Sequence, residues 1–147
     1  MSIGTLLFIA QRAFEEEIVT ALHDAGFNFT IAQGRLAARI GEQGSRLTEL
    51  ANAAGIAKQS AAYLLRQLEE IGLVARQHDP RDARAQLVVL TEYGRKAQLA
   101  ARDIEARIER RWQDLLSPAA FKELKQHLGT LRELVDRHAE SPERQLG

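Results

Sequence analysis

Apolar positions three and four residues apart recur along most of this chain, a spacing typical of amphipathic helices. Residues 3–24 show it most clearly and predict a long helix, which Gly26 ends because glycine readily adopts the left-handed conformation of helix ends. Thr30 and Gln33 are spaced as a capping box, in which each side chain accepts a hydrogen bond from the other residue's backbone N–H. We therefore expect a second helix from there to about Ile40.

Two shorter helices are expected next, with a tight turn between them. The first spans about 45–55, with Ser45 as its N-cap, and the second spans about 58–71, with Gly72 as its stop. This arrangement of two helices around a turn predicts a helix-turn-helix.

A β-hairpin is predicted directly after the helix-turn-helix. Two runs rich in Val and Leu, at 73–78 and 85–90, flank the turn-forming sequence Asp79-Pro80-Arg81-Asp82. A helix-turn-helix places its second helix in the major groove of DNA, and a basic hairpin beside it can reach the backbone or the next groove. DNA binding is therefore the leading hypothesis.

The remainder of the chain predicts two long helices. Thr91 caps one that runs to about Leu116, and Ser117 with Pro118 opens another that ends near His138. Both carry apolar stripes, as does the helix at 3–24. The helix-turn-helix lobe is too small to cover three such stripes, so we expect a twofold homodimer.

Composition places the chain among folded soluble proteins, since 45% of its 147 residues are apolar and 27% are charged. It has no cysteine, which excludes disulfides and thiol chemistry. The apolar run near the N-terminus is too short to span a bilayer and lacks the basic region and cleavage site of a leader. We expect a cytoplasmic protein with no membrane association.

The formal net charge is zero, whereas many nucleic-acid binders are basic. Between Arg46 and Arg84 there are six basic and five acidic residues, so DNA binding requires that folding gather the cations on one face. This balance is the best support for an alternative, a winged-helix adaptor that binds proteins and no duplex.

The helix at 58–71 divides into two faces. Its core face is expected to hold Ala61, Leu64, Leu65 and Leu68. On the opposite face, Gln can pair with adenine, Arg with guanine, and Ala can meet a thymine methyl. No acid occurs between Ala57 and Leu68, which favours a DNA-reading face over an ordinary solvated one.

At the hairpin tip, Arg84 is expected to enter a minor groove and Arg81 to bind phosphate, with Asp79 or Asp82 holding an arginine in place. A solvated, salt-bridged turn is the alternative. The candidate DNA contacts are Ser45, Arg46, Lys58, Gln59, Ser60, Ala62, Tyr63, Arg66, Arg76, Arg81 and Arg84.

Several short motifs together resemble the MarR family of bacterial winged-helix regulators: Leu50-Ala51, Gly55-Ile56, Leu68-Glu69, Gly72-Leu73-Val74, Asp79-Pro80-Arg81-Asp82-Ala83-Arg84 and Leu90-Thr91-Glu92-x-Gly94. The resemblance implies a triangular dimer that binds a roughly palindromic operator, usually represses, and is released by a small, often aromatic ligand. It implies one domain over 1–147, mainly α with a β-hairpin wing. Residues 29–91 would then form the DNA-binding lobe, and 1–28 and 92–140 the dimerisation helices.

Two positions depart from the family pattern. Ala57 stands where Ser or Thr often caps the recognition helix, and a missing cap costs about 1 kcal/mol. Gly34 stands where a bulky aromatic residue is common, and we favour close packing as its reason. The alternative is a ligand pocket formed by Gly34 with neighbouring aromatic side chains, which would be Phe8, Phe14, Phe27 and Phe29.

Catalysis has little support. The four histidines, His23, His78, His127 and His138, lack metal-ligand spacing, and no nucleophile or nucleotide-binding motif occurs. We expect neither a cofactor nor enzymatic activity.

Overall fold

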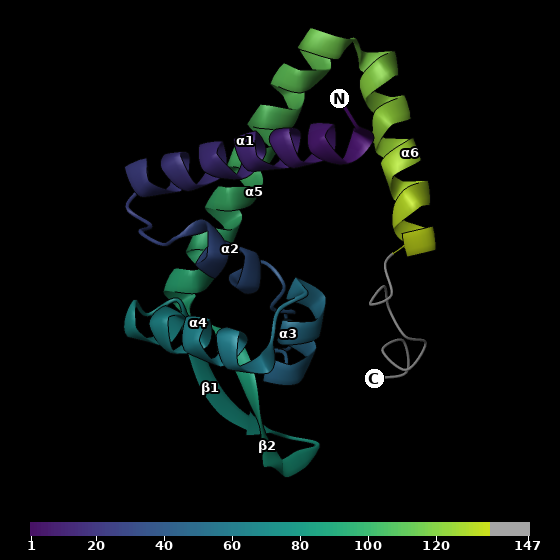
Figure 1. The fold of residues 1–147 in the computed structure, drawn as a ribbon. Helices are drawn as coiled ribbons and strands as arrows, with labels where there is room; N and C mark the ends of the chain where they lie inside the picture. The colour runs from purple at the N-terminus through teal and green to yellow at the C-terminus, as the bar shows by residue number, and fades with distance from the viewer. Residues whose placement is uncertain (136–147) are drawn as a thin grey trace. The chain divides into compact units, whose positions relative to one another are not determined.

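The computed structural model describes residues 1–135 and is mainly helical, with one two-stranded antiparallel sheet (Figure 1). The elements are α1 (Ile3–Asp24), α2 (Ile31–Ala37), α3 (Leu47–Ala54), α4 (Lys58–Glu70), β1 (Val74–Asp79), β2 (Asp82–Leu90), α5 (Glu92–Leu116) and α6 (Pro118–Val135). The chain forms two compact units, Met1–Glu105 and Ala106–Gly147. The predicted fold class is confirmed, whereas the predicted end of the last helix near His138 lies outside the described residues.

The core of the first unit lies where α2, α3, α4 and the hairpin meet. Its largest fully buried side chains include Leu36, Leu50, Leu65 and Leu68, each at most 1% exposed. Removing such a side chain from water contributes about 1.5–3 kcal/mol, so this cluster fixes the position of α4. In Figure 1, α2 lies between α1 and α4, and the hairpin projects away from α4 on the other side.

Three ends of the short helices follow the sequence signals. The Thr30–Gln33 capping box forms, with N···O distances of 3.0 and 3.2 Å, and Gly55 and Gly72 adopt positive φ angles of 67° and 78°. However, α2 ends at Ala37, not near Ile40. The chain tightens there, because the N–H groups of the next residues bond to carbonyls only three residues back, Arg39 to Leu36 and Ile40 to Ala37.

The prediction that Ser45 caps α3 is wrong, since Arg46 occupies the N-cap position. Ser45 instead forms an isolated antiparallel bridge with Val88 of β2. Its backbone N–H donates to the Val88 carbonyl at 2.9 Å, and its carbonyl accepts from the Val88 N–H at 2.8 Å. Its buried hydroxyl accepts a hydrogen bond from the Gly41 N–H at 3.0 Å. Pairing with the strand therefore holds Ser45 outside the helix.

The hairpin extends further toward its tip than the sequence predicted. Val74 pairs with Leu90 at the base, and Asp79 pairs with Asp82 at the tip, which leaves Pro80 and Arg81 as the turn. The register shifts between His78 and Asp79. A long hairpin with a two-residue tip carries the two tip arginines well away from the core.

The junction between β2 and α5 is made by Thr91, as predicted. The Thr91 hydroxyl accepts from the Gly94 N–H at 3.0 Å and donates to the Gly72 carbonyl, and the Thr91 N–H donates to the Leu73 carbonyl at 3.1 Å. Gly94 packs directly on that carbonyl: a Cβ added to Gly94 would overlap the Leu73 oxygen. The close approach requires glycine.

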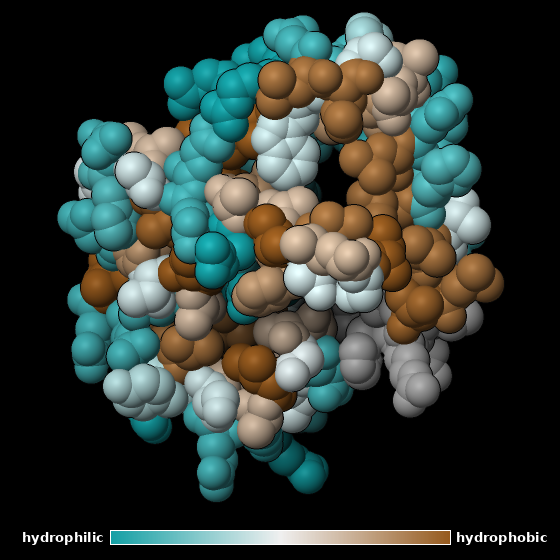
Figure 2. Space-filling view, turned by 45° about the horizontal axis from the view of Figure 1, so that its top comes forward, coloured by the Kyte–Doolittle hydropathy of each residue, from teal (hydrophilic) through white to brown (hydrophobic). Residues whose placement is uncertain are grey.

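The second unit contains the end of α5 and all of α6. Ser117 caps α6 by accepting from the Ala120 N–H at 3.2 Å, which confirms the predicted restart at Ser117 and Pro118. Phe121 is buried, but much of the apolar stripe of α6 is exposed, including Leu124, Leu128 and Leu131. Brown apolar side chains gather over this helix at the right of Figure 2.

We expect Gly94→Ala to lower the free energy of unfolding by roughly 2–3 kcal/mol, because the added methyl group must displace the Leu73 backbone. Gly129→Ala is the matched control. A Cβ there meets no atom within 4 Å, so this variant should gain up to about 1 kcal/mol of helix stability. Urea denaturation measures both, and equal stability of the two variants would contradict the packing at Gly94.

Candidate nucleic-acid interface

Helix α4 presents a polar outer face formed by Lys58, Gln59, Ser60, Tyr63 and Arg66, all exposed. Ala61, Leu65 and Leu68 are buried on the opposite face and anchor the helix in the core. Tyr63 is 57% exposed, which is unusual for an aromatic side chain. The division of the helix predicted from sequence is therefore present, with Leu64 and Ala62 half-buried at its borders.

The start of α4 is also open. Its N-cap residue, Ala57, makes no side-chain cap, as expected from the sequence. The first N–H groups of a helix have no partner within the helix, and the helix dipole concentrates positive potential there. Lys58 and Ser60 lie at this end and add a positive charge and a hydroxyl group, a combination that suits a phosphate oxygen.

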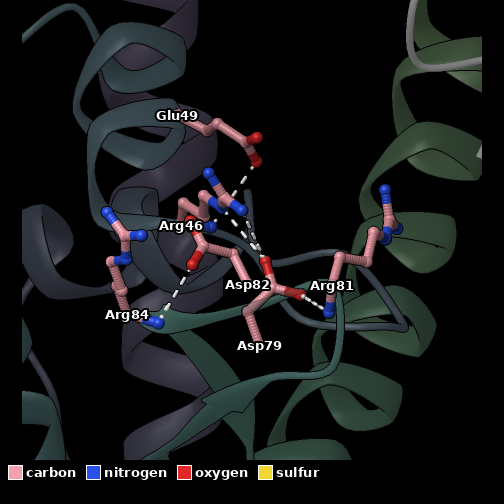
Figure 3. A network of polar contacts seen from close by, with 6 residues as sticks. All are labelled: Arg46, Glu49, Asp79, Arg81, Asp82 and Arg84. Atoms are coloured by element: carbon pink, nitrogen blue, oxygen red, sulfur yellow. Dashed lines mark hydrogen bonds and ion pairs between the residues drawn. The ribbon is translucent and has the colours of Figure 1, made fainter.

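An ion pair that no local sequence pattern predicts connects the hairpin to the N-terminal end of α3 (Figure 3). Arg46 donates from Nε and Nη2 to one carboxylate oxygen of Asp79, at 3.1 and 2.8 Å. The Asp79 side chain is only 5% exposed, so the pair is partly shielded from water. Glu49 accepts from the Arg46 N–H at 3.5 Å and lies on the other side of the same arginine.

The two aspartates hold the hairpin tip through its backbone. Asp79 accepts from the Arg81 N–H at 2.9 Å, and Asp82 accepts from the Arg84 N–H at 3.0 Å. The side chains of Arg81 and Arg84 are exposed and point to opposite sides of the tip (Figure 3). The aspartates therefore hold the backbone at the two arginines, and the guanidinium groups have no ion pair with a described residue.

The charge of Asp79 is stabilised by these contacts. The hydrogen bond from the Arg81 N–H, followed by that from Arg46, holds the pKa of Asp79 below its ordinary value. A carboxylate with a lowered pKa stabilises the fold above its unfolded pKa, and this contribution is lost as the pH falls through the lowered value. Asp79 is therefore ionised at neutral pH, and the tie between α3 and the hairpin persists there.

Three of the candidate DNA contacts are engaged within the protein. Ser45 is buried with its hydroxyl on Gly41, and Arg46 is paired with Asp79. Arg76 donates to Glu69 at 2.6 Å, both side chains being about one-third exposed. Among the candidate DNA contacts, the cationic side chains without an ion pair to a described residue are Lys58, Arg66, Arg81 and Arg84.

A cavity of about 640 Å³ lies in the first unit, bordered by α1, α2 and the first half of α5. Phe14, Phe29 and Gly34 line it, as the pocket hypothesis expected. Phe8 does not and is 61% exposed, and Phe27 packs against Tyr93 with ring centroids 5.2 Å apart.

Gly34 also has a packing reason. A Cβ added there would lie 3.1 Å from the Phe29 ring, so glycine allows this ring to sit close against α2. Close packing and a cavity wall are therefore compatible at this residue, because Phe29 and Gly34 line the cavity together.

Helix α2 connects the cavity to α4. On its cavity side, Arg35 binds Glu15 of α1 in a two-bond ion pair, with both N···O distances 2.6 Å. Two residues earlier, the Gln33 side-chain amide donates to Gln67 of α4 at 3.1 Å. Neither contact was foreseen, since each joins residues at least 20 positions apart with no local spacing to reveal them.

Other kinds of site find no support in the part of the chain that the structure describes. Residues 1–135 contain no group of three His, Asp or Glu side chains placed to hold a metal ion. Among the described helices, none combines the length and the apolar character that a bilayer crossing demands.

Comparison with known proteins identifies the fold. A MarR family model matches residues 29–85, and a search of curated proteins found no match. A crystal structure of MarR is 27% identical, with 93% of this chain and 99% of that chain covered and a TM-score of 0.78.

Two further solved structures carry bound molecules. The transcriptional repressor CouR, bound to a 23-mer DNA duplex, is 28% identical over 88% of this chain and 92% of that chain, with a TM-score of 0.72. The MarR family protein Rv2887 of Mycobacterium tuberculosis, in complex with salicylic acid, is 27% identical over 89% and 96%, with a TM-score of 0.66.

The predicted resemblance is thereby confirmed, by the motif-bearing segment and by the fold that surrounds it. Residues 29–85 match the MarR family model, and the chain has the winged-helix fold of the MarR-type transcriptional regulators to which it is similar over most of its length.

Proposed function

We propose that this protein is a sequence-specific DNA-binding regulator of transcription, acting as a repressor that a small ligand releases. The observation that carries the proposal is the outer face of α4, where Gln59, Tyr63 and Arg66 are exposed with no acid among them. The wing adds Arg81 and Arg84, whose guanidinium groups have no carboxylate partner in the described chain. The similarity to a repressor bound to a DNA duplex supports the same conclusion.

Within this proposal, α4 enters the major groove and the wing contacts the flanking backbone or minor groove. Gln59 and Arg66 have the donor geometry to read bases, whereas Lys58 and Ser60 suit phosphate. Arg46 and Arg76 act through their ion pairs instead, by fixing the hairpin. Ser45 is withdrawn as a contact, because its hydroxyl is turned into the lobe.

The proposed assembly is a homodimer in which residues 1–28 and 92–140 supply the dimerisation helices. Apolar side chains are exposed in both segments, on α1 from Ile3 to Ile9 and on α6 at Leu128 and Leu131. Covering such surfaces on a symmetric partner is the ordinary route to a closed dimer. A twofold dimer would present two α4 helices to a roughly palindromic site.

The proposed ligand site is the cavity beside Phe14, Phe29 and Gly34. Its volume of about 640 Å³ falls in the range of small-molecule pockets. A similar protein binds salicylic acid, which is consistent with an aromatic ligand here. A ligand releases DNA only if it binds more tightly to a conformation whose recognition helices no longer match the operator.

The first test compares single-residue variants in DNA mobility shifts. Arg66→Ala should relax base preference by roughly 5- to 150-fold at one position of the site, since a base contact is worth about 1–3 kcal/mol. Arg84→Ala should weaken binding to all sequences and reduce the salt slope by about one. Arg12→Ala is the control, because Arg12 is exposed on α1 and paired with Glu16.

Binding should fall steeply as salt rises, because released counterions drive association with DNA. Unchanged affinity in both Arg66→Ala and Arg84→Ala would show that another surface is used. Absence of binding to any duplex would support the alternative of a protein-binding adaptor.

Asp79→Asn should weaken DNA binding by roughly tenfold, because loss of the charge frees Arg46 and loosens the hairpin. Asp82→Asn is the matched variant: its amide oxygen can still accept from the Arg84 N–H, so affinity should change little. The unfolding free energy of the wild type should also fall below about pH 4, and this acid sensitivity should be smaller in Asp79→Asn. Equal DNA affinity of the two variants would count against the role of the ion pair.

Light scattering tests the dimer. The wild type should have the mass of two chains, and Leu128→Glu should weaken association at least roughly tenfold, since it places a charge in the apolar stripe of α6. Gln126→Glu adds the same charge on another face of α6 and should leave the mass unchanged. A monomeric wild type would refute the proposed assembly.

A further inference from the structure

We propose that Gln67 binds a DNA phosphate through its side-chain NH2 group, and that Gln33 is the positioning residue that turns this group outward. The two residues form a chain of hydrogen bonds between α2 and α4, and neither lines the cavity. The inference rests on the proposed DNA binding and deepens it, because it names a further contact and the chemical group on DNA that this contact takes.

The orientation of the Gln33 side chain is fixed by the backbone at the start of α2. The Thr30 N–H donates to Gln33 Oε1 at 3.0 Å, and a backbone N–H can only donate. The amide oxygen of Gln33 must therefore face Thr30, and its NH2 group must face the other way. Gln33 is only 8% exposed, so reversing the amide would place two donors against each other in a site with little access to water.

The direction of Gln33 in turn fixes that of Gln67. Gln33 Nε2 donates to Gln67 Oε1 at 3.1 Å, which directs the amide oxygen of Gln67 toward α2. Gln67 Nε2 has no hydrogen bond to a described residue. No buried side-chain nitrogen or oxygen in the described part of the chain lacks a partner, so this NH2 group is open to solvent. The chain of bonds therefore presents a donor at the surface of α4, and not an acceptor.

The position of Gln67 on α4 favours a phosphate over a base edge. Gln67 lies four residues after Tyr63 and seven after Ser60, so the three side chains share one flank of the helix. Gln67 is half-buried, whereas Tyr63 and Arg66 are exposed and reach further out. A side chain at the border of the outer face lies beside the wall of the groove, where the acceptors are phosphate oxygens. With its oxygen turned inward, Gln67 also cannot make the two-bond pair with adenine.

Mobility shifts with Gln67→Met test the contact. Two duplexes are used, one that the wild type selects from a random-sequence pool and one that is unselected. Methionine keeps the length of the side chain and suits a helix, but it has no donor. The variant should bind both duplexes roughly tenfold more weakly, because a hydrogen bond to a charged group is lost.

The salt dependence and the base preference distinguish this contact from other roles of Gln67. The salt slope of Gln67→Met should equal that of the wild type, since a neutral amide displaces no counterion. The preference for the selected duplex should also be unchanged, because a phosphate contact carries no sequence information. If Gln67 served only to place α4, its loss would change the base preference instead.

Gln33→Glu tests the positioning role, because it reverses the polarity of the chain of bonds. Glutamate completes a capping box as glutamine does, so α2 should still form. The second carboxylate oxygen can only accept, which forces Gln67 to turn its NH2 group inward and its oxygen toward the phosphate. Binding to both duplexes should therefore fall at least roughly tenfold.

Ala32→Glu is the matched control for the added charge. Ala32 precedes Gln33 on α2 and is exposed, so this variant places a negative charge in the same helical turn and leaves the hydrogen bonds intact. Gln33→Glu should cost at least roughly fivefold more affinity than Ala32→Glu. In the Gln67→Met background the two variants should cost the same, because no amide remains to be reversed. Thermal unfolding of each variant checks that it is folded.

The inference is overturned if Gln67→Met binds both duplexes as the wild type does, if its base preference changes, or if Gln33→Glu costs no more than Ala32→Glu. NMR on the wild type gives an answer without any variant: added duplex should slow hydrogen exchange of the Gln67 NH2 group, and unchanged exchange refutes the contact. A wild type that binds no duplex refutes the proposed function and this inference with it, whereas full binding by Gln67→Met refutes this inference alone.

Discussion

The ion pair between Arg46 and Asp79 connects the helix-turn-helix to the hairpin, and the geometry of the candidate interface depends on it. The same Asp79 carboxylate also holds the Arg81 backbone, so one nearly buried charge fixes the base of the tip and its direction. Arg76 and Glu69 form a similar contact between α4 and β1. These pairs explain how a chain of zero net charge can present cations. Some acids pair with the arginines that connect the hairpin to the helices, and the arginines at the hairpin tip keep their charge without an acidic partner among the described residues.

Local features of this fold could be predicted from sequence. The Thr30–Gln33 capping box, the stop at Gly72 and the restart at Ser117 are set by residues within a few positions of one another, and each was found as expected. Ser45 was misassigned because its conformation is decided by a strand more than 40 residues away, at Val88. Its sequence neighbours alone are compatible with a helix cap.

The candidate site was predictable by residue type but not by contact. The faces of α4 follow from helical periodicity, so Gln59, Tyr63 and Arg66 could be placed on the outside. The sequence separates Arg46 from Asp79 by 33 positions and Gln33 from Gln67 by 34, and nothing in the local pattern couples them. Which arginines are exposed and which are paired is a property of the folded lobe.

The approach of Gly94 to the Leu73 carbonyl has a mechanical consequence. Contacts between side chains can slide by changing rotamer, whereas here backbone lies against backbone, and the Thr91 N–H adds a hydrogen bond to the same oxygen. The first turn of α5 and the start of β1 therefore behave as a rigid joint. A tilt of that turn would therefore move the start of β1, at the base of the hairpin. Substitution of the surrounding surface residues during evolution would leave this backbone contact in place.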